Sequence, residues 1–247
     1  MPTASAEFEA QLELFRTEGQ SAIQFFYAWD ATHAVAASDK SVVKLLNQAP
    51  LFWNTALGAL QSSTLVALGR VFDPDPKNHS VTRLLSLAHA NPDIFSKEAL
   101  AERKRAHNAS ADEWLSDYLN TAYVPDSVDF RRLKRYVAAR RKIYQQNYSP
   151  LRHKVFAHRG VATPTEVSEL FSNTNLRELR QLLIFLGRLY EALWQLYHNG
   201  RKPSLQPARF SVKAMLERPS PTAKDGDLQE RLVYEAKLFL TRHSVDT

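Results

Sequence analysis

The sequence contains no cysteine, which excludes disulfide bonds, thiolate metal ligands and thiol nucleophiles. This absence favours a reducing compartment, because disulfides are typical of secreted proteins. Residues 1–10 lack the basic segment and apolar run of a secretory signal peptide. The most apolar stretch, residues 182–197, is interrupted by Arg188 and Glu191, whereas a membrane-spanning helix needs about 20 mostly apolar residues. We therefore expect a cytoplasmic protein that does not enter a membrane.

Glycine is scarce as well, with seven residues, and the twelve prolines gather between apolar runs of helical period. No strand-like alternation bounded by Asn-Gly or Asp-Gly turns is present, and neither is a Gly-rich phosphate loop or a nucleophile elbow. The histidines outside residues 149–160 lack the spacing with carboxylates that a zinc site needs. The sequence therefore predicts an all-α protein with no metal site and no cofactor.

Apolar residues at helical spacing predict the main helices. The basic run at residues 128–147 is also expected to be helical, and Ser149 with Pro150 predicts the start of another short helix, which Gly160 would end. The other expected helices span residues 6–37, 41–72, 81–90, 97–107, 111–119 and 175–198, the last ending at Asn199-Gly200.

The C-terminal part has a different composition. Residues 201–227 hold four of the twelve prolines and predict a connector with at most one short helix. An amphipathic helix is expected to follow at residues 228–243. We therefore expect a helical bundle over residues 1–200 and an extension over residues 201–247, packed either on this bundle or on a second subunit.

Positive charge is concentrated in one segment. Ten Lys or Arg residues and no Asp or Glu occur from Arg131 to Arg159; since the whole chain carries +6 and this segment +10, the remainder carries −4. Such segregation attracts polyanions, although a charged face that only contacts water is the alternative. Tyr136, Tyr144 and Tyr148 lie in the same segment and fit either base stacking or core packing. The candidate RNA-binding residues are Arg131, Arg132, Arg135, Arg140, Arg141, Lys142, Lys154 and Arg159.

The end of the basic segment also carries groups suited to phosphodiester chemistry. Arg152, His153 and His158 lie within the stretch SPLRHKVFAHRG, residues 149–160. Histidine moves protons near neutral pH, and the arginine fork holds a phosphate through two hydrogen bonds. The three residues are therefore candidates for phosphodiester cleavage without a metal ion.

The spacing Arg152-x5-His158, with the polar His153 directly after the arginine, resembles the Arg-x4–6-His motif of the HEPN superfamily. The segment LRHKVFAHRG is most similar to the corresponding segment of the abortive-infection AbiU-type branch. A second element agrees: residues 52–75, followed by residues 80–85, are similar to the long second helix of that branch, which ends in an Arg-hydrophobic-Phe-Asp unit. The resemblance covers about two thirds of the chain, as far as His198.

The resemblance implies a bundle of long antiparallel helices, a homodimer with a composite cleft, and cleavage of RNA by attack of a ribose 2′-hydroxyl on the adjacent phosphate. His158 would be general base or acid, Arg152 would bind the scissile phosphate, and His153 would assist. Arg70 and Asp73 are candidates to orient Arg152, with a structural Arg–Asp pair as the alternative. The products would be a 2′,3′-cyclic phosphate and a 5′-hydroxyl.

The same resemblance implies a role in phage defence or as a toxin, with an antitoxin or another defence partner. Some HEPN toxins carry a modified tyrosine two residues after the histidine, but here that position is Gly160, so this route of neutralisation is not expected.

Helix geometry leaves two arrangements of the site open. On an ideal helix Arg152 and His158 lie about 120° apart and about 9 Å along the axis. Either the helix is irregular there, or a second protomer supplies part of the site. His158 also falls near Leu151 and Val155, where it could be a core residue. The alternative function is a non-catalytic nucleic-acid-binding or scaffold protein with the same fold.

Overall fold

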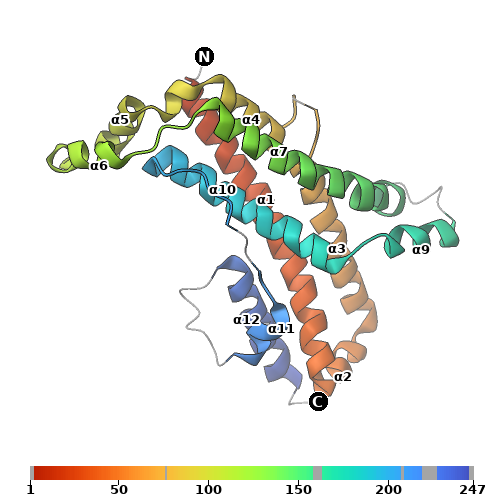
Figure 1. Ribbon diagram of the computed structural model, residues 1–247. Coiled ribbons are helices and arrows are strands. Elements are labelled where there is room, and N and C mark those ends of the chain that lie inside the picture. Colours follow the sequence, from red (N-terminus) through yellow and green to blue (C-terminus); the bar gives the residue numbers. More distant parts are fainter. Residues whose placement is uncertain (1–2, 76, 158–162, 207–208, 219–226, 245–247) are drawn as a thin grey trace.

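A computed structural model describes residues 3–75, 77–157, 163–206, 209–218 and 227–244. These residues form helices and connecting turns without a strand, which confirms the predicted all-α class. Figure 1 shows α1 (Ala4–Ser38) running along the bundle, with α3 (Pro50–Val71) beside it and α10 (Leu176–Asn199) crossing it. No helix in the described ranges is long and apolar enough to cross a membrane.

The central helix α1 begins at a cap that its sequence supplies, since the Thr3 side chain accepts a hydrogen bond from the Ala6 backbone N–H at 3.2 Å. Its inner face carries Phe8, Leu12 and Phe26, all almost fully buried. These side chains join residues of α3, α4 (Val81–Ala90) and α10 in one continuous core. The bundle is thus organised around α1.

The helix predicted for residues 41–72 is broken in its first third, so the prediction of one continuous helix is wrong. α2 (Lys40–Gln48) ends before Ala49, whose backbone angles are φ −133° and ψ 61°, and α3 begins at Pro50. Proline has no N–H to continue a helix and disfavours the helical conformation in the residue before it. The break therefore follows from Pro50.

The shorter helices agree closely with the sequence pattern. α4 and α5 (Lys97–His107) have the predicted bounds, with Ser80 and Ser96 as their caps. The helix expected at residues 111–119 is divided into a 3₁₀ turn at Ala111–Glu113 and α6 (Leu115–Thr121). The prediction missed a 3₁₀ turn at Pro92–Phe95 and α9 (Pro164–Ser172).

The end of α10 confirms the predicted stop at Asn199-Gly200. Gly200 adopts the left-handed conformation, with φ 54° and ψ 38°, which glycine accepts without a steric penalty. Its carbonyl accepts a hydrogen bond from Tyr123 N at 2.7 Å. This contact ties the chain before α7 (Ser127–Ile143) to the end of α10.

The C-terminal helices α11 (Val212–Glu217) and α12 (Leu228–Ser244) pack on this same chain, which is one of the two arrangements expected. Val212, Met215 and Val233 belong to the main core, and α12 contacts α1 and α2. Figure 1 shows both helices alongside the C-terminal half of α1. The division of the chain at residue 200 stays a prediction.

Candidate functional site

The basic segment begins on α7, whose two faces differ. Asp126 and Asp129 form a capping box at its first turn. Phe130, Leu133 and Val137 are buried on its inner face, which packs against α4. The basic side chains of α7 therefore lie on its solvent-facing side or at the border between this side and the buried face. Among them Arg131, Arg132, Arg135 and Lys142 are exposed, whereas Lys134, Arg140 and Arg141 are partly buried.

The partly buried cations of α7 contact neutral groups. The Arg140 guanidinium lies over the Phe185 ring at 5.4 Å, and Arg141 donates to the Thr82 hydroxyl at 3.3 Å. Within the described ranges, none of the basic residues from 131 to 154 forms a salt bridge with a carboxylate. The salt bridges of these ranges use other arginines, namely Arg16, Arg70, Arg83, Arg105 and Arg180. The positive charge of the segment is thus not paired with carboxylates in the described residues.

Beyond Ile143 the chain stays helical but widens. Tyr144–Tyr148 and Arg152–Ala157 are π-helical, separated by the single turn α8 (Ser149–Leu151). The prediction that Ser149 caps a new helix is therefore wrong: the chain continues in helical form from α7, the Ser149 N–H donates to the Tyr144 carbonyl, and the N-cap of α8 is Tyr148. Pro150 supplies no N–H to the preceding turn, which accounts for a local departure from α-helical bonding. π-helical turns are frequent at functional sites.

Two buried tyrosines fix the widened segment. The Tyr144 hydroxyl donates to the Leu65 carbonyl at 3.1 Å, and its ring stacks on Phe72. The Tyr148 hydroxyl donates to the Asn175 carbonyl at 2.8 Å. Burial raises the pKa of both tyrosines. These two residues are core anchors and not stacking platforms.

Arg152 emerges from this anchored segment and reaches the last turn of α3. A Cβ atom placed on Gly69 would lie 2.9 Å from the Arg152 guanidinium carbon and 2.9 Å from the Tyr144 hydroxyl. Burial raises the pKa of Tyr144, while the neighbouring Arg152, through hydrogen bonding and charge, lowers it. Arg152 is partly buried and has no carboxylate partner in the described part of the chain. Its charge is therefore held in place without being neutralised.

The predicted orienting residues make other contacts. Arg70 is exposed and pairs with Glu18 at 3.3 Å. Asp73 accepts hydrogen bonds from Asp75 N at 2.9 Å and from Asn78 Nδ2 at 3.0 Å. In the described ranges neither one forms a hydrogen bond or salt bridge with Arg152, which instead lies against Gly69 and Tyr144. The sequence offered one signal for Gly69, since a glycine inside a helix costs stability and needs a reason.

The remaining candidates lie after Arg152. His153 and Lys154 are exposed. His158 and Arg159 lie outside the described residues, and so does Gly160, the predicted end of this helix. The structure thus brings Arg152 and its basic surroundings together, and the role of His158 stays a prediction.

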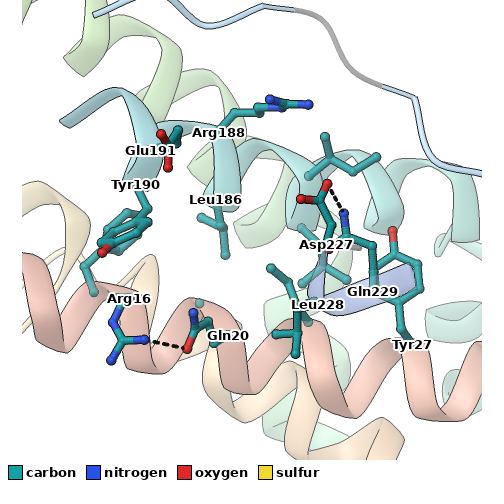
Figure 2. Close-up of a pocket in the computed structure, with 16 residues that line it drawn as sticks. Arg16, Gln20, Tyr27, Leu186, Arg188, Tyr190, Glu191, Asp227, Leu228 and Gln229 are labelled. Atoms are coloured by element: carbon teal, nitrogen blue, oxygen red, sulfur yellow. Dashed lines mark hydrogen bonds between the residues drawn. The ribbon is translucent and has the colours of Figure 1, made fainter. Parts of the chain in front are cut away.

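The structure has further hollows, and one of them, lined by Tyr148 and Leu151 among others, borders the basic segment. Figure 2 shows another of about 370 Å³ between α1, α10 and the start of α12, lined by Arg16, Tyr27, Arg188 and Glu191 among others. None of its lining residues belongs to residues 131–159. Across the described ranges, no group of three or more His, Asp or Glu side chains is arranged as ligands for a metal ion.

The fold and the Arg152 segment can now be compared with known proteins. The model of a HEPN family described as AbiU2 matches residues 5–217. The chain belongs to this AbiU2-type HEPN family. It is therefore a HEPN-like abortive-infection protein. The match runs from α1 through α11, so it includes the basic segment and leaves α12 outside. Neither a search of curated proteins nor a search of solved structures gave a significant match.

Proposed function

We propose that this AbiU2-type HEPN protein is a metal-independent endoribonuclease that acts in phage defence or as a toxin. One observation carries the proposal: Arg152 is partly buried and anchored, yet no carboxylate in the described residues pairs with it. An arginine kept only for stability is usually paired when it is buried. An unneutralised, fixed arginine suits the stabilisation of an oxyanion.

The proposed reaction is an internal transfer on RNA. The ribose 2′-oxygen attacks the adjacent phosphorus, the O2′–P bond forms and the P–O5′ bond breaks. One group accepts the proton of the 2′-hydroxyl and another gives a proton to O5′, leaving a 2′,3′-cyclic phosphate and a 5′-hydroxyl. His158 serves as one of these two groups, and His153 assists or orients the phosphate.

Arg152 would act through charge at the phosphate. Negative charge develops on the nonbridging oxygens as the fifth bond to phosphorus forms, and the guanidinium fork can donate to two of them. Partial burial reduces solvent screening and strengthens this interaction. The anchors at Tyr144 and Gly69 mean that the arginine needs little reorganisation when RNA binds.

RNA would reach the site along α7. Arg131, Arg135 and Lys142 are exposed without a carboxylate partner in the described residues, and each can release counterions from a bound strand. Tyr136 is 39% exposed between them and offers a ring on which a base can stack.

We also propose that the active form is a homodimer, as the resemblance implies. A second protomer would add another arginine and histidine segment at a shared cleft. Control of such an enzyme calls for an antitoxin or another defence partner, and Gly160 argues against neutralisation by tyrosine modification at that position.

The alternative is a non-catalytic RNA binder, which the exposed cations of α7 favour equally. A binder has no need of His158, so cleavage separates the two. Purified protein is incubated with total RNA in EDTA, beside a His158→Ala variant as control. The nuclease proposal predicts fragments with the wild type and far fewer with the variant. RNA that is bound but intact supports the binder instead.

A further inference from the structure

The last turn of α3 makes an unusually close contact with Arg152. Gly69 is buried, and an added Cβ there would lie 2.9 Å from the Arg152 guanidinium carbon and closer still to one of its nitrogens. Separations below about 3 Å are not tolerated between such atoms, so any side chain would displace the guanidinium and press on the Tyr144 hydroxyl, which is also 2.9 Å away. The present position of Arg152 therefore requires a glycine at residue 69.

Glycine has a cost at this point. It lies inside α3, where it is less favourable than alanine by about 1 kcal/mol. Gly58, in the same helix, has no heavy atom within 4 Å of the corresponding Cβ position. The close approach is thus particular to Gly69, and no general crowding of α3 accounts for it.

The end of α3 also suits a cation electrostatically. α3 ends at Val71, and the C-terminal turn of a helix carries partial negative charge from its free carbonyls. A guanidinium at Gly69 lies on this turn, so the end of the helix stabilises its charge. The Asp73 carboxylate also acts on the neighbouring Tyr144 hydroxyl, but in the described residues it forms no salt bridge with Arg152. The Tyr144 hydroxyl lies beside the guanidinium, forms a hydrogen bond with it and limits its movement.

We propose that Gly69 is a positioning residue for Arg152: the bare backbone at this point of α3 lets the guanidinium lie where it can stabilise the reacting phosphate. This inference rests on the proposed ribonuclease function for its effect on the reaction. The placement of Arg152 can be tested without it.

The test compares Gly69→Ala with Gly58→Ala. Both changes add the same methyl group to α3 and the same helix propensity, so Gly58→Ala controls for the stability of the helix. Gly58→Ala should cleave RNA like the wild type. Gly69→Ala should lower kcat by about 10²-fold, because a displacement of about 1 Å can have that effect. The affinity for RNA should change little, since α7 is untouched.

A second arm shows whether Gly69 acts through Arg152. In an Arg152→Ala background the guanidinium is absent, so adding Gly69→Ala should give no further loss of cleavage. An additional large loss in this background would overturn the proposal. This arm also remains informative if the single variant Gly69→Ala folds poorly.

A spectroscopic arm is independent of cleavage. Tyr144 labelled with ¹³C at Cζ reports on its hydroxyl, and Arg152 lowers the pKa of that hydroxyl against the effect of burial. The added methyl group would also contact the Tyr144 hydroxyl directly, so Gly69→Ala is measured in the Arg152→Ala background as well, where only that direct contact acts. Gly69→Ala should shift the Tyr144 signal and raise its pKa more in the wild-type background than in the Arg152→Ala background, whereas Gly58→Ala should leave the signal unchanged. Equal shifts in the two backgrounds would overturn the positioning role. An unchanged Tyr144 signal in Gly69→Ala overturns the positioning role. A shift that depends on Arg152, in a protein that never cleaves RNA, supports the positioning and contradicts the proposed function.

Discussion

Arg152 places its guanidinium against the backbone of Gly69, although 82 residues lie between them in the sequence. The contact joins the end of the basic segment to the last turn of α3, a helix that packs along α1. The candidate phosphate-binding group is thereby fixed to the centre of the bundle. This relationship leads to predictions about binding, assembly, stability and cleavage.

The first prediction concerns RNA binding by α7. Replacing Arg131, Arg135 and Lys142 with glutamine should leave up to three phosphates without a cation and flatten the log–log dependence of affinity on salt by about 0.7 for each of them. Fluorescence anisotropy with a single-stranded RNA at several salt concentrations measures this slope. The matched control replaces two arginines and one lysine elsewhere, Arg231, Arg242 and Lys213. Equal slopes in the two triple variants would contradict binding through α7.

The second prediction concerns the dimer. Sedimentation should show a dimer at micromolar concentration. If Arg152 and His158 of one site come from different protomers, mixing Arg152→Ala with His158→Ala should restore about a quarter of wild-type cleavage, because half the dimers are mixed and each holds one intact site. A dimer without restored cleavage places both residues of each site in one chain. Monomer at all concentrations would contradict the composite site.

The third prediction concerns the bundle itself. Arg180 holds Asp30 through two hydrogen bonds of 2.9 and 2.7 Å, and the Asp30 side chain is only 6% exposed. Arg180→Leu would leave this carboxylate buried and unpaired. The free energy of unfolding should fall by about 2 kcal/mol, less than for a fully buried pair, because the Arg180 side chain is 31% exposed. Urea denaturation measures the change. Arg177→Leu, at an exposed position of α10, should change it by less than about 0.5 kcal/mol. Equal effects would show that the pair adds no stability.

The fourth prediction uses the pKa of His198. Burial lowers this pKa below its ordinary value, and Arg103, Lys104 and His107 act in the same direction, while Glu9 opposes them. The unfolded chain therefore binds the proton at higher pH than the folded chain. The free energy of unfolding should therefore fall as the pH decreases through the interval between the ordinary histidine pKa and the lower pKa of His198 in the folded protein. In His198→Asn the melting temperature should fall less over this interval. An unchanged pH dependence would contradict the prediction.

Much of the fold could be predicted because apolar spacing and caps act locally. The bounds of α4 and α5, the stop at Gly200 and the final helix all follow from nearby residues. The break at Pro50 could have been predicted from the same local rules, since proline restricts the residue before it. The prediction missed the break because the apolar residues before and after Pro50 continue with the same helical spacing.

Less of the candidate site could be predicted from the sequence. The motif indicates Arg152, and the run of positive charge indicates α7, because both are properties of consecutive residues. The positions of Gly69 and Tyr144 relative to Arg152 depend on how the widened segment packs against α3, which no local pattern encodes. The same limit applied to Arg70 and Asp73, which are close to Gly69 in sequence but make their contacts with Glu18 and with the following turn.

The most direct test of the central claim is cleavage of a defined RNA in EDTA, with the product ends identified by mass spectrometry. The wild type should leave 2′,3′-cyclic phosphate ends and spare DNA. Arg152→Ala and His158→Ala should each cleave about 10²-fold more slowly or worse, and the double variant should lose much less than the product of the two effects. RNA that is bound yet uncleaved, both in EDTA and with Mg²⁺, would contradict the nuclease account, and a fully active His158→Ala would contradict the role given to His158.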